Sequence, residues 1–256
     1  MLKIKSMYYF EGFNKFNTFS EFLDKLSWRI ERQLLKDRVA IYEALPIYQE
    51  LKKEFNSKML TIWPLKEEEI ITWFDTLLLM RRLLFELFKC GIKSDNMHIV
   101  MEYPLIYGNH MRADYLFIYE RSIIVLEFGM FNQDERRSEE RYTKKLQESI
   151  SHRQIIANMV HTSVEVTNYV MIYRPEFDRI HNIYSKENIE YNNNEISLLS
   201  GFIQSKIKNQ DNLLALHQLE KINIYWLIYI LVEFYKHYDI IELAIIFEVQ
   251  IIWRRK

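Results

Sequence analysis

Apolar residues in the first part of the chain recur at the spacing of an amphipathic helix. The pattern follows a short strand expected over residues 2–10 and a turn over 12–17. It begins at Thr18 and predicts one helix that ends just before Pro46. Proline ends the pattern because it lacks a backbone donor and clashes with the preceding helical turn. A second, shorter helix is expected over residues 47–56.

A longer amphipathic helix is predicted from residue 66 to Gly91. Pro64 stands where a first-turn proline is expected, and the three glutamates at 67–69 favour the positive end of a helix dipole. Apolar residues then recur every three or four positions. Glycine is the residue that most often follows the last turn of a helix, so Gly91 marks the end of this one.

The pattern changes after Asn96 to short runs of β-branched and aromatic residues, which are typical of strands. The second and third runs are apolar on both faces, which indicates a central sheet covered by helices. The expected elements are strands over 98–106, 113–119 and 122–128, a charged helix over 134–161, and a strand over 166–173.

The remainder of the chain is predicted to be an exposed loop followed by helices. The asparagine-rich stretch over 181–195 favours the loop, and helices are expected over 203–218, 221–237 and 239–253. The predicted organisation is therefore an N-terminal strand and helical extension over 1–65, an α/β core over 66–175 and a C-terminal helical region over 176–256.

Three acidic residues fall on the predicted strands: Glu102, Asp114 and Glu127. The spacing between Asp114 and Glu127 suits two antiparallel strands joined by a tight turn, which would place the two side chains next to each other. A carboxylate within an apolar strand is costly unless something compensates its charge. A divalent cation such as Mg²⁺, which takes one or two carboxylates together with waters and phosphate oxygens, would do so. Pairing with Arg112 or Arg121 is the alternative.

Composition narrows the class of protein. The 256 residues are 49% hydrophobic and 27% charged, which is typical of a folded globular chain. The formal net charge of −1 shows no basic excess of the kind expected for a protein that binds nucleic acid tightly by itself. Cys90 is the single cysteine, so an internal disulfide is excluded. The apolar segment 222–253 is interrupted by charged residues, and a cytoplasmic protein without a membrane span is expected.

The segment from Glu102 to Met130 resembles the core of PD-(D/E)XK nucleases, as found in defence-associated and helicase-linked domains of bacteria. These families show a glutamate–tyrosine–proline strand, an arginine–x–aspartate strand and a hydrophobic strand that ends in glutamate–x–lysine. The matching residues here are Glu102-Tyr103-Pro104, Arg112-Ala113-Asp114 and Glu127-Phe128-Gly129. The resemblance implies an α/β restriction-endonuclease-like core (helix, three strands, helix, strand) with helical N- and C-terminal extensions. It also implies that Asp114 and Glu127 bind Mg²⁺ or Mn²⁺, with Glu102 as an additional member of the acidic cluster.

One position departs from that pattern, because Gly129 stands where the family has its lysine. In some nucleases of this fold the lysine comes from the following helix, and Lys144 and Lys145 are the candidates here. We favour Lys145 because it lies nearer the apolar stripe of that helix, and Gln147 matches a glutamine that the family often has there. His152, on the same helix, could reach the site, but a surface position is favoured for it.

The predicted function is metal-dependent hydrolysis of DNA, in phage defence or in a mobile element, with a separate ATPase or helicase as a partner. Arg136, Arg137 and Arg141 give the 134–155 helix a basic face that would meet a phosphate backbone. A solvated helix with internal salt bridges is the alternative for that face. The alternative for the whole chain is a degenerate nuclease that binds protein or nucleic acid without cleaving it, with C-terminal helices that bury themselves against a partner or a second copy.

Overall fold

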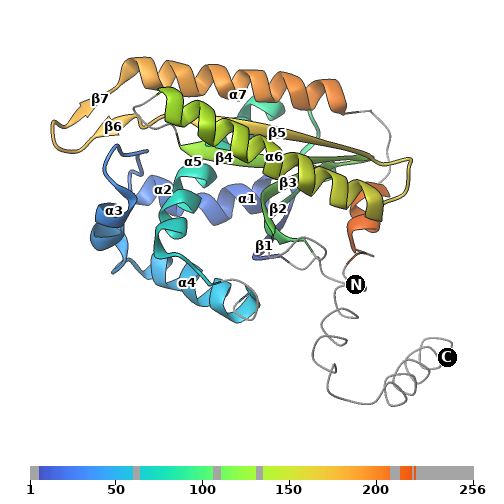
Figure 1. Ribbon diagram of the computed structural model, residues 1–256, viewed down its shortest axis with the longest axis horizontal. Helices are drawn as coiled ribbons and strands as arrows, with labels where there is room; N and C mark the ends of the chain where they lie inside the picture. Colours follow the sequence, from blue (N-terminus) through green and yellow to red (C-terminus); the bar gives the residue numbers. More distant parts are fainter. Residues whose placement is uncertain are drawn as a thin grey trace, which may run out of the picture.

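The computed structural model describes residues 6–59, 64–105, 111–130, 135–207, 214–220 and 222. Within these ranges the chain forms a five-stranded mixed sheet with helices on both faces (Figure 1). The fold is therefore of the mixed α/β class. No helix in the described part of the chain combines the length and the apolar character needed to cross a membrane.

The sheet has its strands in the order in which they occur in the sequence. Neighbouring strands are antiparallel from the first to the fourth, and the fifth pairs in parallel with the fourth. The strands are β1 (Tyr8–Glu11), β2 (Met97–Pro104), β3 (Arg112–Tyr119), β4 (Ser122–Met130) and β5 (Glu165–Tyr173). A parallel neighbour requires a crossover connection, and the helix α6 (Glu135–Met159) provides it. The predicted order of helix, three strands, helix and strand is thus confirmed.

Helices cover both faces of the sheet. The helix α6 packs on one face against β4 and β5, where Asn168 of β5 donates a hydrogen bond to Ser149 of α6. The other face is covered by α1 (Gly12–Ser20), α5 (Glu67–Lys89) and α7 (Lys186–Lys206). The smaller helices α2 (Phe22–Lys25), α3 (Leu35–Tyr42) and α4 (Pro46–Met59) lie beside α5, at the lower left of Figure 1.

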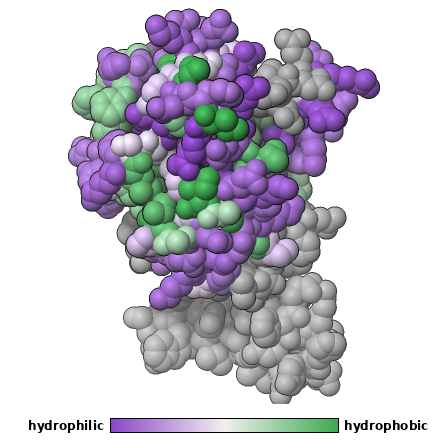
Figure 2. All heavy atoms as spheres, turned by 90° about the vertical axis from the view of Figure 1, so that its left-hand side faces the viewer, coloured by the Kyte–Doolittle hydropathy of each residue, from purple (hydrophilic) through white to green (hydrophobic). Residues whose placement is uncertain are grey.

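A single hydrophobic core joins the three predicted segments of the chain. It includes Met7 and Phe16 from the first segment, much of α5, β3 and β4 from the second, and Ile196 and Leu199 from the third. Figure 2 shows the side of the molecule where α3 and the hairpin of β6 (Phe177–Asp178) and β7 (Ile183–Tyr184) lie. This side is largely hydrophilic with separate hydrophobic spots. Apolar side chains scattered singly in this way are ordinary for a protein surface.

The end of α5 matches the sequence-based prediction in detail. Gly91 has a φ of 84°, in the left-handed region that glycine adopts easily. The Gly91 N–H donates to the Phe88 carbonyl at 3.0 Å, and the Ile92 N–H donates to the Leu87 carbonyl at 3.2 Å. These two bonds form the Schellman motif, which satisfies carbonyls left unpaired at the end of a helix.

The predicted single helix from Thr18 to Pro46 was wrong. The helix α1 begins earlier, at Gly12, where a turn was predicted, because the Ser94 hydroxyl accepts a hydrogen bond from the N–H of Phe13 at 3.0 Å. The helix α1 ends at Ser20, the short α2 follows, and the helical path stops at Ser27, whose φ is 49°. The Ile30 carbonyl accepts hydrogen bonds from the N–H groups of residues 176 and 177, so pairing with a distant segment replaces the helix.

The predicted loop over 181–195 was also wrong. A two-stranded hairpin of β6 (Phe177–Asp178) and β7 (Ile183–Tyr184) leads directly into α7. The Ser185 hydroxyl caps α7 by accepting from the Asn188 N–H at 3.3 Å. Asn192 is buried and binds the backbone of Arg174 through both ends of its amide, so this asparagine anchors the helix. The predicted helix over 203–218 is divided between α7 and residues 214–220, and the two helices predicted after residue 220 lie outside the described residues, except Ile222.

Candidate active site

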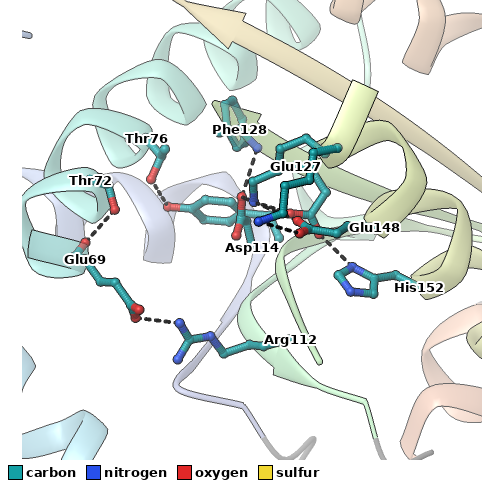
Figure 3. A network of polar contacts seen from close by, with 12 residues as sticks. Glu69, Thr72, Thr76, Arg112, Asp114, Glu127, Phe128, Glu148 and His152 are labelled. Carbon is teal, nitrogen blue, oxygen red and sulfur yellow. Dashed lines mark hydrogen bonds and ion pairs between the residues drawn. The ribbon is translucent and has the colours of Figure 1, made fainter. Parts of the chain in front are cut away.

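Asp114 and Glu127 occupy neighbouring positions on β3 and β4. Tyr115 pairs with Leu126 in the antiparallel register, so the next position along places Asp114 opposite Glu127. The two side chains point to the face of the sheet that α6 covers (Figure 3). The side chain of Tyr115 points to the other face, where its hydroxyl lies 3.1 Å from that of Thr76 on α5. The alternation of a β-strand thus separates the acids from the α5 side of the core.

Lys145 of α6 bridges the two carboxylates. Its ammonium group lies 3.0 Å from Asp114 Oδ2 and 2.8 Å from Glu127 Oε2. The N–H of Phe128 donates to the same Asp114 oxygen at 2.9 Å, which fixes the orientation of that carboxylate. One cation therefore lies at the point where two acidic side chains converge.

His152 reaches the same group from two turns further along α6 than Lys145. Its Nδ1 lies 2.8 Å from Glu127 Oε1, and the residue is only 3% exposed. The expectation that His152 lies at the surface was therefore wrong. The spacing explains the placement, because positions 145, 148 and 152 recur at intervals of three and four residues and share one face of a helix. Glu148, the third member of this face, lies 4.0 Å from the Lys145 ammonium.

Burial and neighbouring charges shift the pKa values of these groups in different directions. Burial and the nearby Asp114 charge raise the pKa of Glu127 well above its usual range. Burial also acts on Asp114, but the Lys145 charge and the Phe128 N–H outweigh it, and the pKa of Asp114 is lowered. The two carboxylates outweigh burial at Lys145 and raise the pKa of its ammonium. Burial lowers the pKa of His152 to about 4. At neutral pH the site thus holds an ionised Asp114, a charged Lys145 and a neutral His152.

Glu102 of β2 belongs to a different set of contacts. Its Oε1 accepts a hydrogen bond from the Trp73 indole at 2.7 Å, and its other oxygen pairs with the guanidinium of Arg112. Arg112 also donates to Glu69 of α5 at 2.6 Å (Figure 3). Burial raises the pKa of Glu102 to about 8. The predicted cluster of three acids is thus split into a pair that shares Lys145 and a third acid that holds Arg112, whereas Arg121 bonds to neither Asp114 nor Glu127 in the contacts described.

The other predicted residues divide between the cavity and the surface. A cavity of about 790 Å³ is lined by Asp114, Lys145 and His152, together with Arg141 and Lys144. Gln147, predicted as a helper, is exposed and does not line it. Arg136 and Arg137 are also exposed and lie outside the lining, and Arg136 forms an ion pair with Glu140 at 3.4 Å. Of the three arginines predicted to contact nucleic acid, only Arg141 reaches the cavity.

Gly129 has little space for a side chain. A Cβ at this position would lie 2.7 Å from Ile172 Cδ1 and 3.4 Å from Arg141 Cδ. The position where the family has its lysine therefore faces the stem of an α6 residue, and the cation that meets the acids comes from the helix instead. This agrees with the sequence-based choice of Lys145 over Lys144, whose side chain is 80% exposed.

The site offers two carboxylates, but no larger set of protein ligands among the described residues, to a divalent cation. No group of three or more His, Cys, Asp and Glu side chains arranged to hold a metal occurs among the described residues. Asp114 and Glu127 already converge on a cation, the Lys145 ammonium, with one oxygen each. Two carboxylates completed by waters and substrate oxygens are an ordinary set of ligands for Mg²⁺. Asp114 and Glu127 are thus the residues that would hold the metal.

Comparison with known proteins adds no identification. No family model matches the sequence, and neither the curated proteins nor the solved structures contain a significant match. The functional argument rests on the geometry of the site.

Proposed function

We propose that the chain is a metal-dependent nuclease of the PD-(D/E)XK type that hydrolyses phosphodiester bonds in DNA. The observation that carries this proposal is the convergence of Asp114, Glu127 and Lys145 beside a cavity that Asp114 and Lys145 line. The three residues come from β3, β4 and the crossover helix α6, and the resemblance places its metal-binding acids and its helix-borne lysine on these same elements. The order of helix, three strands, helix and strand supports a restriction-endonuclease-like core.

The residues of the chain divide the chemical work. Asp114 and Glu127 would hold a Mg²⁺ or Mn²⁺ ion, which would supply a more acidic water and stabilise charge on the phosphoryl oxygens. Lys145 is a fixed cation whose ammonium donates to the scissile phosphate or to the attacking water. The raised pKa of Lys145 keeps it protonated at neutral pH, so it acts as a donor and not as a base. His152 orients Glu127 through the 2.8 Å contact to Oε1.

The proposed substrate and setting follow from the resemblance. DNA is the proposed substrate, and phage defence or a mobile element is the proposed setting. A formal net charge of −1 supports cooperation with another protein, such as a separate ATPase or helicase, because the chain lacks a general attraction for phosphates. The resemblance to bacterial defence domains supports a cytoplasmic location.

Cleavage of plasmid, linear and single-stranded DNA with Mg²⁺ or Mn²⁺ tests the proposal. We expect the wild type to cleave, and we expect Asp114→Asn, Glu127→Gln and Lys145→Met each to lose about 100-fold or more in rate, because each removes a group that stabilises transition-state charge. Asp24→Asn is the matched control, since it makes the same carboxylate-to-amide change on an exposed helix outside the cavity. A wild type that cleaves no DNA, alone or with candidate partners, would contradict the proposal.

A binding subunit derived from such a nuclease is the second candidate. The observation that favours it is that Lys145 already satisfies both carboxylates, and no third metal ligand lies among the described residues. Calorimetric titration with Mn²⁺ separates the two functions. Metal binding that disappears in Asp114→Asn favours the nuclease, and its absence from the wild type favours the binding subunit.

A further inference from the structure

Gly129 and Arg141 form a close contact beside the catalytic acids. Gly129 lies two residues after Glu127 on β4, and the Arg141 stem passes over it, with Cδ and Cγ 3.4 and 3.6 Å from the position of a Cβ. A Cβ at residue 129 would meet Arg141 at ordinary van der Waals distance, so the Arg141 stem packs directly over this position of the strand.

The guanidinium of Arg141 is held in place at the cavity. Its Nη1 donates to the carbonyl of Met130 at 2.6 Å, and the residue lines the cavity next to Lys145. Among the described residues no carboxylate forms an ion pair with Arg141. An arginine carries five donors in a fixed planar arrangement, and one bond to a carbonyl leaves the others available.

We infer that Arg141, held by the Met130 carbonyl, binds a phosphate of the nucleic-acid strand next to the phosphate that is cleaved. This inference rests on the proposed function, because it assigns a subsite to the same cavity. A guanidinium is well suited to phosphate, since its parallel N–H groups meet two oxygens at once. The tether to Met130 fixes its position before the strand arrives, which reduces the entropic cost of binding.

The subsite would place a second cation beside the motif position at residue 129. A lysine at residue 129 would need space next to Ile172 Cδ1 and the Arg141 stem. The chain instead carries its proposed catalytic cation on α6, at Lys145, and Arg141 of the same helix brings a second cation to the cavity. Both cations lie on one face of α6, where residues 141 and 145 are one turn apart.

Steady-state cleavage kinetics and DNA binding test the inference. Arg141→Gln is compared with Arg136→Gln, which removes the same charge from the same helix outside the cavity. We expect Arg141→Gln to raise KM about 10-fold with kcat nearly unchanged, because a contact to a phosphate that does not react is made equally in ground and transition states. Arg136→Gln should leave KM within about 2-fold.

Substrates with one uncharged methylphosphonate identify what Arg141 touches. For the wild type, a methylphosphonate at one position beside the scissile bond should raise KM by about the same 10-fold. On that substrate Arg141→Gln should cause no further rise in KM. The dissociation constant of oligonucleotides for the Asp114→Asn form, measured by fluorescence anisotropy without metal, gives the same comparison without cleavage. An Arg141→Gln penalty that persists on every methylphosphonate substrate would overturn the phosphate assignment.

The outcomes separate the two proposals. Cleavage by the wild type with equal KM for Arg141→Gln and Arg136→Gln overturns the subsite and leaves the nuclease proposal intact. DNA binding that depends on Arg141 without any cleavage supports the subsite and contradicts the nuclease proposal. A wild type that neither cleaves nor binds DNA overturns both.

Discussion

Replacing Asp75 by asparagine should destabilise the whole fold, because it breaks a buried ion pair between two distant parts of the chain. Asp75 lies in the middle of α5, and Arg38 lies on α3. The two guanidinium nitrogens of Arg38 donate to the two carboxylate oxygens at 2.7 Å each, and both side chains are fully buried. The Trp28 indole donates to the same carboxylate at 2.9 Å. The contact of the guanidinium with the Trp28 ring, 5.2 Å from its centroid, completes the group.

The expected loss follows from the charge that the substitution leaves behind. Asparagine keeps the volume of aspartate and one acceptor, but Arg38 remains charged, because arginine stays protonated in proteins. The buried Glu31 carboxylate, 3.9 Å from Arg38 Nε, is then its nearest counter-charge. Loss of the bidentate partner of a buried charge costs about 3–5 kcal/mol. Removing both charges together, as in Arg38→Met with Asp75→Leu, should recover most of that loss, because an apolar pair of similar volume avoids the desolvation penalty.

Urea unfolding followed by tryptophan fluorescence measures both effects. Asp24→Asn is the matched control, because Asp24 also receives two hydrogen bonds from an arginine of α5, at 2.9 and 2.8 Å, but its side chain is 66% exposed. Exposed pairs contribute about 0–1 kcal/mol. If Asp75→Asn cost no more than Asp24→Asn, or if the double variant were as unstable as the single one, the charge argument would be refuted.

Three further predictions concern the site and the edge of the sheet. His98 is buried and burial lowers its pKa, so the folded chain holds it neutral while the unfolded chain takes up a proton. The free energy of unfolding should therefore fall as the pH drops below about 6.5, by at most about 1.4 kcal/mol per pH unit. Urea titrations at several pH values should show a smaller slope for His98→Gln. His152→Phe should lower the unfolding free energy by about 1–3 kcal/mol, because Glu127 loses a buried hydrogen-bond partner, and an unchanged urea midpoint would contradict this. Gly129→Lys should not restore DNA cleavage to Lys145→Met, because neighbouring side chains occupy the space at residue 129, and recovery of cleavage would show that this space is open.

The elements that were predicted well from the sequence are those in which the local sequence pattern agrees with the burial that the whole fold imposes. The strands β3 and β4 are buried along nearly their whole length, and this is why both read as apolar on both faces. The boundaries of α5 were predicted from its acidic start and from Gly91. In these segments local propensity, burial pattern and end signals agree, so a sequence-based reading is reliable.

The N-terminal segment shows where local pattern fails. Its apolar residues keep helical spacing on both sides of Ser27. The chain nevertheless turns at Ser27, and Ile30 pairs with residues 176 and 177. Such pairing joins positions almost 150 apart in the sequence, so no local signal reveals it. The ion pair of Arg38 with Asp75 has the same origin. For this reason the predicted boundary at residue 65 separates two parts of the chain that share one core.

The pairing of Asp114 with Glu127 could be predicted because hairpin spacing alone determines which residues are opposite. Lys145 was predicted from the position of the apolar stripe on its helix. His152 lies seven residues from Lys145 on the same helical face, and the sequence allowed it to reach the site. A surface position was nevertheless preferred for it. Burial of a histidine beside a carboxylate depends on tertiary packing, which the helical pattern of a charged segment shows only weakly.

Glu102 shows the limit of reasoning from register. The pairing of β2 with β3 continues on both sides of it, and by count Glu102 stands opposite Asp114. A regular strand would therefore place three carboxylates on three adjacent strands. The backbone of Glu102 has instead a φ of 55°, which costs a residue with a side chain about 1–2 kcal/mol. The hydrogen bond from Trp73 and the ion pair with Arg112 offset that cost and direct the carboxylate away from the Lys145 group. A third negative charge beside Asp114 and Glu127 would raise their mutual repulsion, so the local strain leaves the pair able to share a single cation.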